Sequence, residues 1–184
     1  MRKEIKRKYL IWENGIDYSN ENLKAIYHSI RELRKDVLVN GGFIEQGYLH
    51  LGIGMEIARK LGLVLNFEPD SARLRKQGER KRCGKYKFYF ALKSKGHGSR
   101  DEEEPEITPE LFSEYWSQTR GERVEKVRLD VPYKGYVLQI DVFTDRDLIL
   151  AEIEVGTEEE LNCLEPVGLD VTEDKKYKNQ HLAK

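Results

Sequence analysis

Apolar and charged residues alternate along many short segments of this chain, and a period of two predicts β-strands. The pattern predicts strands over residues 4–12, 43–49, 63–68, 71–77, 86–95, 99–104, 124–132, 136–143 and 148–155. Apolar residues at helical spacing predict amphipathic helices over about 22–37 and 52–62. Thr108-Pro109 begins a third helix, and a capping box over 157–160 begins a fourth, short one. A last helical turn is predicted near the end of the chain.

Charged and polar residues recur two positions apart within these strands, so the members of each pair project from the same face, roughly 6–7 Å apart. The pairs are Glu4-Lys6-Lys8, Arg73-Arg75, Lys93-Lys95, Glu102-Glu104, Lys126-Arg128, Gln139-Asp141 and Glu152-Glu154. Apolar residues stand between the partners and face the other way: Ile5, Leu74, Leu92, Val127, Ile140 and Ile153. The pattern favours an α+β fold, a barrel or strongly curved sheet with helices packed outside over its apolar face.

Two interpretations of the charged face remain open from the pattern alone. Antiparallel sheets commonly expose one polar, solvated face, and each pair taken singly has that appearance. Several pairs, however, carry like charges that repel each other, as in Arg73-Arg75 and Glu152-Glu154. A polyanion facing the bases and a cation facing the acids would compensate this repulsion. On that second interpretation the charged face lines a cavity.

Composition narrows the class of protein. The chain has 184 residues, 39% of them apolar and 35% charged, which suits one domain with an ordinary core. Its 32 basic and 33 acidic residues nearly cancel, which argues against an extended nucleic-acid interface. Cys83 and Cys163 are too few for a disulfide framework or a zinc site. No signal peptide or membrane-spanning run is present, so we expect a cytoplasmic protein.

Short motifs in a fixed order carry a resemblance to a known family. They are Glu4-Ile-Lys-Arg-Lys8, Ile44-Glu-Gln-Gly-Tyr-Leu49, Arg73-Leu-Arg75, Leu92-Lys-Ser-Lys95, Arg100-Asp-Glu-Glu-Glu104, Lys126-Val-Arg128, Ile140-Asp-Val-Phe143, Leu150-Ala-Glu-Ile-Glu154 and the stretch from Asp170 to Asn179. In this order they resemble the CYTH, or triphosphate tunnel metalloenzyme, superfamily, in its small single-domain bacterial form. The resemblance implies a single domain over 1–184 and an eight-stranded antiparallel barrel with a triphosphate-binding tunnel. Residues 51–69 are extra sequence between two family strands.

The resemblance also assigns candidate site residues. The phosphate-binding bases it implies are Arg73, Arg75, Lys93, Lys95, Arg100, Lys126, Arg128 and Lys176. The acidic positions, some of which hold Mg²⁺ or Mn²⁺ in the family, are Glu4, Glu102, Glu104, Asp141, Glu152 and Glu154. Lys8, Glu152 and Glu154 are the residues to which it gives catalytic roles.

One position departs from the family. Its signature Glu-x-Glu-x-Lys becomes Glu4-Ile-Lys6-Arg-Lys8 here, a charge reversal at a metal-binding position. The function implied is metal-dependent hydrolysis of inorganic triphosphate or a related organic triphosphate. The alternatives are a class IV-type adenylyl cyclase, and a non-catalytic polyphosphate- or nucleotide-binding protein whose metal site has decayed at Lys6. The partner implied is a triphosphate-containing small molecule, with no membrane or nucleic acid.

Overall fold

The structure is a computed structural model that describes residues 2–79, 84–96 and 99–183. Eleven strands in these ranges form one antiparallel sheet. Eight of them are longer: β1 (Arg2–Glu13), β3 (Gly42–Leu49), β4 (Pro69–Gly78), β5 (Lys87–Ser94), β6 (Ser99–Glu103), β8 (Arg123–Tyr133), β9 (Tyr136–Phe143) and β10 (Leu148–Val155). The other three are β2 (Ile16–Asp17), β7 (Glu106–Ile107) and β11 (Leu169–Asp170). The molecule is thus a mixed α+β protein built on a large antiparallel sheet.

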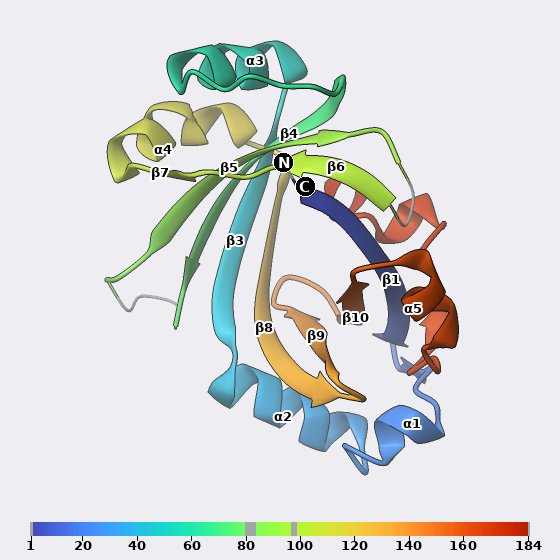
Figure 1. The fold of residues 1–184 in the computed structure, drawn as a ribbon. Helices are drawn as coiled ribbons and strands as arrows, with labels where there is room; N and C mark the ends of the chain where they lie inside the picture. Colours follow the sequence, from blue (N-terminus) through green and yellow to red (C-terminus); the bar gives the residue numbers. More distant parts are fainter. Residues whose placement is uncertain (1, 80–83, 97–98, 184) are drawn as a thin grey trace.

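The strand order brings distant parts of the chain together. Neighbouring strands run β10-β9-β8-β3-β4-β5-β6-β1, and β1 also pairs with β10. In this last pairing Lys8 lies opposite Glu152, and Lys6 opposite Glu154. The first strand therefore hydrogen-bonds to β6 along Arg2–Ile5 and to β10 along Ile5–Glu13. The sheet curves strongly, as Figure 1 shows.

Helices cover the apolar side of this curved sheet (Figure 1). They are α1 (Glu21–Lys24), α2 (Ile30–Asn40), α3 (Leu51–Lys60), α4 (Pro109–Trp116), followed by a 3-10 turn at Ser117–Thr119, and α5 (Glu158–Cys163). The 3-10 turn at Lys175–Tyr177 and α6 (Asn179–Leu182) pack on the other, charged side. Leu33 and Val37 of α2 join a core cluster that contains Leu138 and Ile140 of β9. Ile57 of α3 packs in a second cluster, with residues of β4, β5 and α4.

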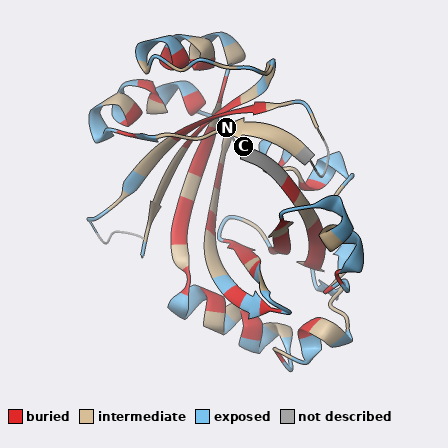
Figure 2. Ribbon diagram, in the orientation of Figure 1, coloured by how far each residue is buried: buried red, intermediate tan, exposed pale blue. Residues whose placement is uncertain are grey.

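Alternation along the strands separates the two faces as the sequence predicts. Of the apolar residues between the charged partners, Ile5, Leu74, Leu92, Ile140 and Ile153 are buried in the helix-covered clusters, and Val127 packs against one of them. Figure 2 shows buried positions along the strands and on the sides of the helices that meet them. The predicted apolar face of the sheet, with helices packed on it, is confirmed.

Two predicted elements differ from the structure. Residues 63–68 contain no strand among the described residues, because this segment links α3 to β4 and has no neighbour to pair with. The single helix predicted over 22–37 is two helices, α1 and α2, of which the second begins at a cap where Ser29 Oγ accepts from the Glu32 backbone N–H. The segment 51–69, which the resemblance implies is extra sequence, contains α3. Its Gly54 lies so close to Ala72 of β4 that a Cβ there would come within 2.3 Å of the Ala72 Cβ.

Candidate functional site

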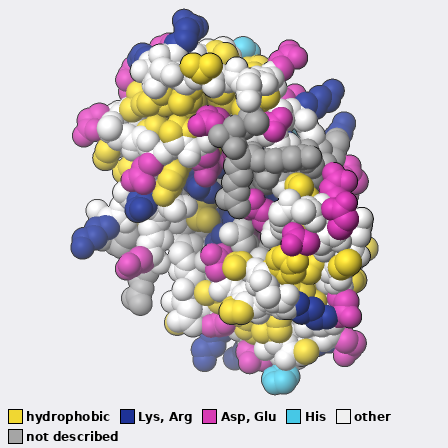
Figure 3. All heavy atoms as spheres, viewed as in Figure 1, with side chains coloured by type: hydrophobic (Ala, Val, Ile, Leu, Met, Phe, Trp, Pro, Cys, Tyr) yellow, Lys and Arg dark blue, Asp and Glu magenta, His cyan; other side chains and the backbone are white. Residues whose placement is uncertain are grey.

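The charged face of the sheet surrounds a cavity of about 280 Å³. Its lining includes nine basic side chains: Lys6, Lys8, Arg73, Arg75, Lys93, Arg100, Lys126, Arg128 and Lys178. Five acidic side chains line it as well: Glu102, Glu104, Glu152, Glu154 and Asp174. Figure 3 shows basic side chains deep in a recess near the middle of this face, with acidic side chains beside them. The interpretation of the paired charges as the lining of a cavity is therefore the one that the structure supports.

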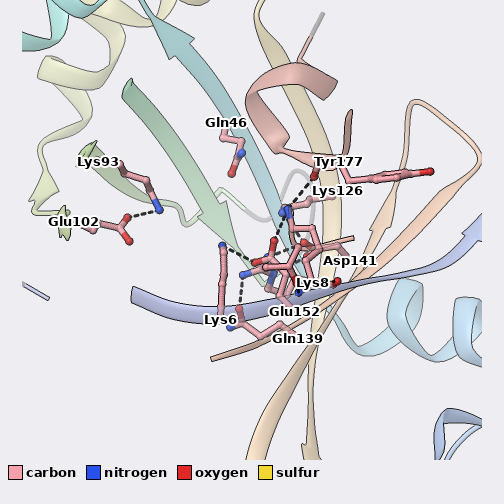
Figure 4. A network of polar contacts seen from close by, with 12 residues as sticks. Lys6, Lys8, Gln46, Lys93, Glu102, Lys126, Gln139, Asp141, Glu152 and Tyr177 are labelled. Carbon is pink, nitrogen blue, oxygen red and sulfur yellow. Dashed lines mark hydrogen bonds and ion pairs between the residues drawn. The ribbon is translucent and has the colours of Figure 1, made fainter. Parts of the chain in front are cut away.

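Glu152 of β10 is the centre of one group of ion pairs in this cavity (Figure 4). Its carboxylate lies 2.8 Å from Lys8 Nζ and 3.2 Å from Lys6 Nζ, one lysine at each oxygen. Arg128 Nη2 is 3.6 Å away. Although burial opposes ionisation, Lys6 and Lys8 hold the pKa of Glu152 well below its ordinary value. Glu152 is thus a carboxylate at neutral pH, and its charge is offset by bases of β1 and β8.

Asp141 of β9 forms a second group, behind the cavity wall. It is 1% exposed and accepts from Lys126 Nζ at 2.6 Å and from Arg128 Nε and Nη2 at 2.6 Å each. Lys126 is equally buried, and burial lowers its pKa to about 7 although Asp141 opposes the shift. Gln139 accepts from Arg128 Nη1 at 2.7 Å, so this guanidinium is held from two sides. The arrangement fixes two cations at the cavity surface.

A third group joins β4, β5, β6 and the residue that follows β6, Glu104. Arg73 pairs with Glu104 and lies 3.4 Å from Glu102, while Lys93 is 2.8 Å from Glu102. Arg75 is 2.5 Å from Glu104 and stacks over the Tyr89 ring. Burial and the neighbouring Arg73 lower the pKa of Arg75 to about 10. Repulsion between the buried guanidinium of Arg73 and the partly buried one of Arg75 indicates a site that an anion would stabilise.

Most of the site residues predicted from the sequence line this cavity, but a few of them lie elsewhere. Lys95 is exposed, because β5 ends at Ser94 and the alternation ends with it. Lys176 is also outside the cavity lining, since its ammonium lies 2.7 Å from Glu13. Lys178 lines the cavity in its place. The side chain of Glu4 lies outside the described residues.

Several lining residues were not predicted. Gln46 and Tyr48 point from β3 into the cavity, and Gln46 Nε2 donates to Tyr48 Oη at 2.9 Å. Burial raises the pKa of Tyr48, so its hydroxyl stays protonated. The same period of two marks this pair, but both residues are uncharged, so the pattern of paired charges does not include them. Asn179 and Gln180 belong to α6, and nothing local in the sequence indicates that this helix reaches the cavity.

An apolar cluster lies beyond one end of the charged cavity. Along the inward-facing positions, Lys8 is followed by Leu10, and Glu152 is preceded by Leu150. Leu10 and Leu150 pack in one cluster with Val124, Phe143, Tyr177 and Leu182. The cluster therefore joins the strands to the 3-10 turn at Lys175–Tyr177 and to α6. The Tyr177 backbone carbonyl accepts from Lys8 Nζ at 2.9 Å and so connects this end to the charged part.

Fold and site together define a protein with a cavity of mixed charge, suited in charge to a polyanion, on one face of a strongly curved antiparallel sheet. The chain is 38% identical over 117 residues to an inorganic triphosphatase of Nitrosomonas europaea, a match that covers 60% of this chain and 73% of the relative. The crystal structure of an inorganic triphosphatase superposes with a TM-score of 0.54 and 27% identity, covering all of this chain and 95% of the other. No family model matches the sequence. The chain belongs to the CYTH, or triphosphate tunnel metalloenzyme, superfamily.

Membership of this superfamily implies a bound divalent cation. The arrangement of the carboxylates in the cavity shows whether they could bind one. Hard cations take several oxygen ligands, with Mg²⁺ close to octahedral. Among the described residues, no group of three or more acidic, histidine or cysteine side chains is placed to hold a metal. Both oxygens of Glu152 face lysines, and Asp141 is enclosed by two bases. The described donors do not fit a cation held by the protein alone, and the metal roles predicted for the acidic residues stay predictions.

No helix in the described part of the chain is long and apolar enough to cross a membrane.

Proposed function

We propose that this chain hydrolyses inorganic triphosphate, or a related linear triphosphate, in the cavity described above. The observation that carries the proposal is the excess of four cations in one enclosed site, nine lining bases against five lining acids. A linear triphosphate has two terminal groups and one internal group and carries about four to five negative charges near neutral pH. Charge and enclosure therefore match this ligand class. The relationship to a named inorganic triphosphatase supports the same substrate.

The proposal includes the closed architecture that the sequence predicts. We take β1, β3, β4, β5, β6, β8, β9 and β10 as the eight strands of a barrel, in a single domain spanning 1–184. The pairing of β1 with both β6 and β10 supports this architecture. In such a barrel the charged face is shielded from bulk water, which strengthens each interaction between a base and a phosphate oxygen.

The chemistry is mostly positioning and charge neutralisation. Water attacks the terminal phosphorus, the bond to the bridging oxygen breaks, and orthophosphate and diphosphate leave. The transition state spreads charge over the phosphoryl oxygens, which cations can meet without covalent chemistry. Arg73, Arg75 and Arg128 are suited to planar, two-point contacts with phosphate oxygens, and the lysines to point contacts. Glu102 and Glu104 hold Arg73 and Arg75 in place, and Asp141 and Glu152 hold Arg128.

A phosphate-release assay tests the proposal. Tripolyphosphate, thiamine triphosphate and ATP are each supplied with Mg²⁺, with Mn²⁺ (the two cations that the sequence predicts) or with a chelator. We expect tripolyphosphate to release phosphate fastest. Replacing a lining base, Arg75→Gln, should lower kcat/KM by about tenfold or more, the loss of one charge-assisted contact. Lys35→Gln on the exposed face of α2 is the matched control and should leave the rate unchanged.

The same reactions separate the alternative functions. Product analysis with ATP distinguishes cyclic AMP and diphosphate from free phosphate, and cyclic AMP as the main product would replace hydrolysis with cyclisation. Tight tripolyphosphate binding with no turnover under any metal condition would show a binding protein instead. Equal rates for Arg75→Gln and the unaltered protein would show that the reaction does not take place in this cavity.

A further inference from the structure

Lys6 places an ammonium group in the wall of the cavity, beside a carboxylate. It is the residue of β1 that lies opposite Glu154, and its Nζ is 3.2 Å from Glu152 Oε2. Lys8, two positions on, projects the same way and takes the other oxygen of Glu152 at 2.8 Å. Both lysines line the cavity. The neighbourhood of Glu152 is therefore already supplied with cations from the chain itself.

A divalent cation at Glu152 would meet these lysines at short range. Like charges repel, and the repulsion is strong where burial lowers the effective dielectric constant. The Glu152 carboxylate is ionised because of the same two lysines, so its charge is already matched and its attraction for a metal is reduced. Hard cations need several oxygen ligands. Two other carboxylates of the cavity, Glu102 and Glu104, are engaged instead in ion pairs with Arg73, Arg75 and Lys93.

We propose that the Lys6 ammonium acts as a built-in cation: it takes the place of a divalent metal beside Glu152, and the chain binds triphosphate tightly without a metal ion. This inference rests on the proposed function and deepens it. An ammonium has three N–H donors and can face a carboxylate and a phosphate oxygen together. Triphosphatases of this superfamily are generally metal-dependent, so this chain differs from them in what binds its substrate.

Equilibrium binding of a hydrolysis-resistant triphosphate tests the proposal without depending on turnover. Isothermal titration calorimetry with imidotriphosphate, whose bridging oxygens are NH groups, is run in EDTA and in Mg²⁺. The unaltered protein should bind within about threefold of the same Kd in both buffers. Lys6→Glu should bind about 30-fold or more weakly in EDTA, because a cation is lost and an anion gained. In Mn²⁺ its affinity should recover to within about threefold.

Direct metal binding gives an independent readout. Electron paramagnetic resonance of added Mn²⁺, in the absence of triphosphate, should show a bound ion for Lys6→Glu and only free ion for the unaltered protein. Lys6→Met removes the charge without adding a ligand, so it should lose EDTA affinity and not regain it with Mn²⁺. Lys35→Glu makes the same charge change on an exposed helix face and should behave as the unaltered protein. Circular dichroism melting of each variant ensures that folded proteins are compared.

The outcomes separate this inference from the proposed function. Binding by the unaltered protein that is about tenfold or more tighter in Mg²⁺ than in EDTA overturns the built-in cation and leaves the proposed function standing. Mn²⁺ binding of equal affinity to the unaltered protein and to Lys6→Glu overturns it as well. Absence of imidotriphosphate binding in every buffer overturns the proposed function, and the inference with it.

Discussion

Removing the charge of Asp141 is the perturbation whose cost the structure defines best. Asp141→Asn keeps the shape of the side chain but leaves two buried cations without their anion, since Lys126 and Arg128 each contact the carboxylate at 2.6 Å. Asp141 and Lys126 are both 1% exposed, so water cannot replace the lost partner. Breaking a buried ion pair by removing one partner costs about 3–5 kcal/mol of unfolding free energy.

Two features of the site place the expected loss at the lower end of that range. Lys126 already has its pKa lowered to about 7 by burial and can shed its proton when the carboxylate is gone. Arg128 cannot, but it keeps Gln139 at 2.7 Å and Glu152 at 3.6 Å. We therefore expect a loss of about 3 kcal/mol, which in a chain of this size lowers Tm by about 6–12 °C.

Urea unfolding and thermal melting, both followed by circular dichroism, measure this loss. Asp145→Asn, an exposed position in the turn between β9 and β10, is the matched control and should change stability by about 0.5 kcal/mol or less. Added tripolyphosphate should restore part of the lost stability, because an anion in the cavity again faces Lys126 and Arg128. Equal stabilities of the two variants would refute the reasoning, since it would show that the buried cations do not need Asp141.

The remaining predictions concern pH and packing. Because Lys126 loses its proton above about pH 7 and a bound polyanion favours the charged form, tripolyphosphate affinity should fall by up to about tenfold per unit as pH rises from 7.5 to 9.5. In Lys126→Arg the fall in tripolyphosphate affinity with rising pH should be much smaller, as measured by titration calorimetry. An unchanged pH dependence would show that a group other than Lys126 loses the proton. Gly54→Val should cost about 1–3 kcal/mol, because the new Cβ would lie 2.3 Å from that of Ala72. Gly52→Ala, in the same helix with its nearest neighbour at 3.4 Å, should unfold at the same or a slightly higher urea concentration than the unaltered protein, because alanine has the higher helix propensity. A Gly54→Val variant as stable as Gly52→Ala would show that the close approach to Ala72 costs nothing.

The strands and their two faces could be read from the sequence because alternation is a local property. Strands β9 and β10 have the bounds that the period of two predicts, and the apolar residues between charged partners are buried under the helices. Prediction was less accurate where an alternating segment has no neighbouring strand to pair with, or where the strand ends within the alternating pattern. Residues 63–68 alternate but pair with nothing, and Lys95 belongs to a charged pair that the end of β5 divides.

The residues that line the cavity could be predicted from the sequence only in part. The like-charged pairs Arg73-Arg75 and Lys126-Arg128 line the cavity as expected. Gln46 and Tyr48 share their spacing but carry no charge, so a search for charged pairs passes over them. Lys178 lines the cavity and Lys176 does not, a difference fixed by the 3-10 turn that directs Lys176 to Glu13.

The sequence by itself determined that this protein has strands with one apolar and one ionic face, because side-chain direction along a strand depends only on the neighbouring residues. Only the tertiary structure decided which base meets which acid. Lys6 and Glu152 are 146 positions apart, and the antiparallel pairing of β1 with β10 brings them together. Asp141 lies behind the wall rather than open to the cavity for the same reason, since strand register and long-range packing set the partners that a local pattern leaves unspecified.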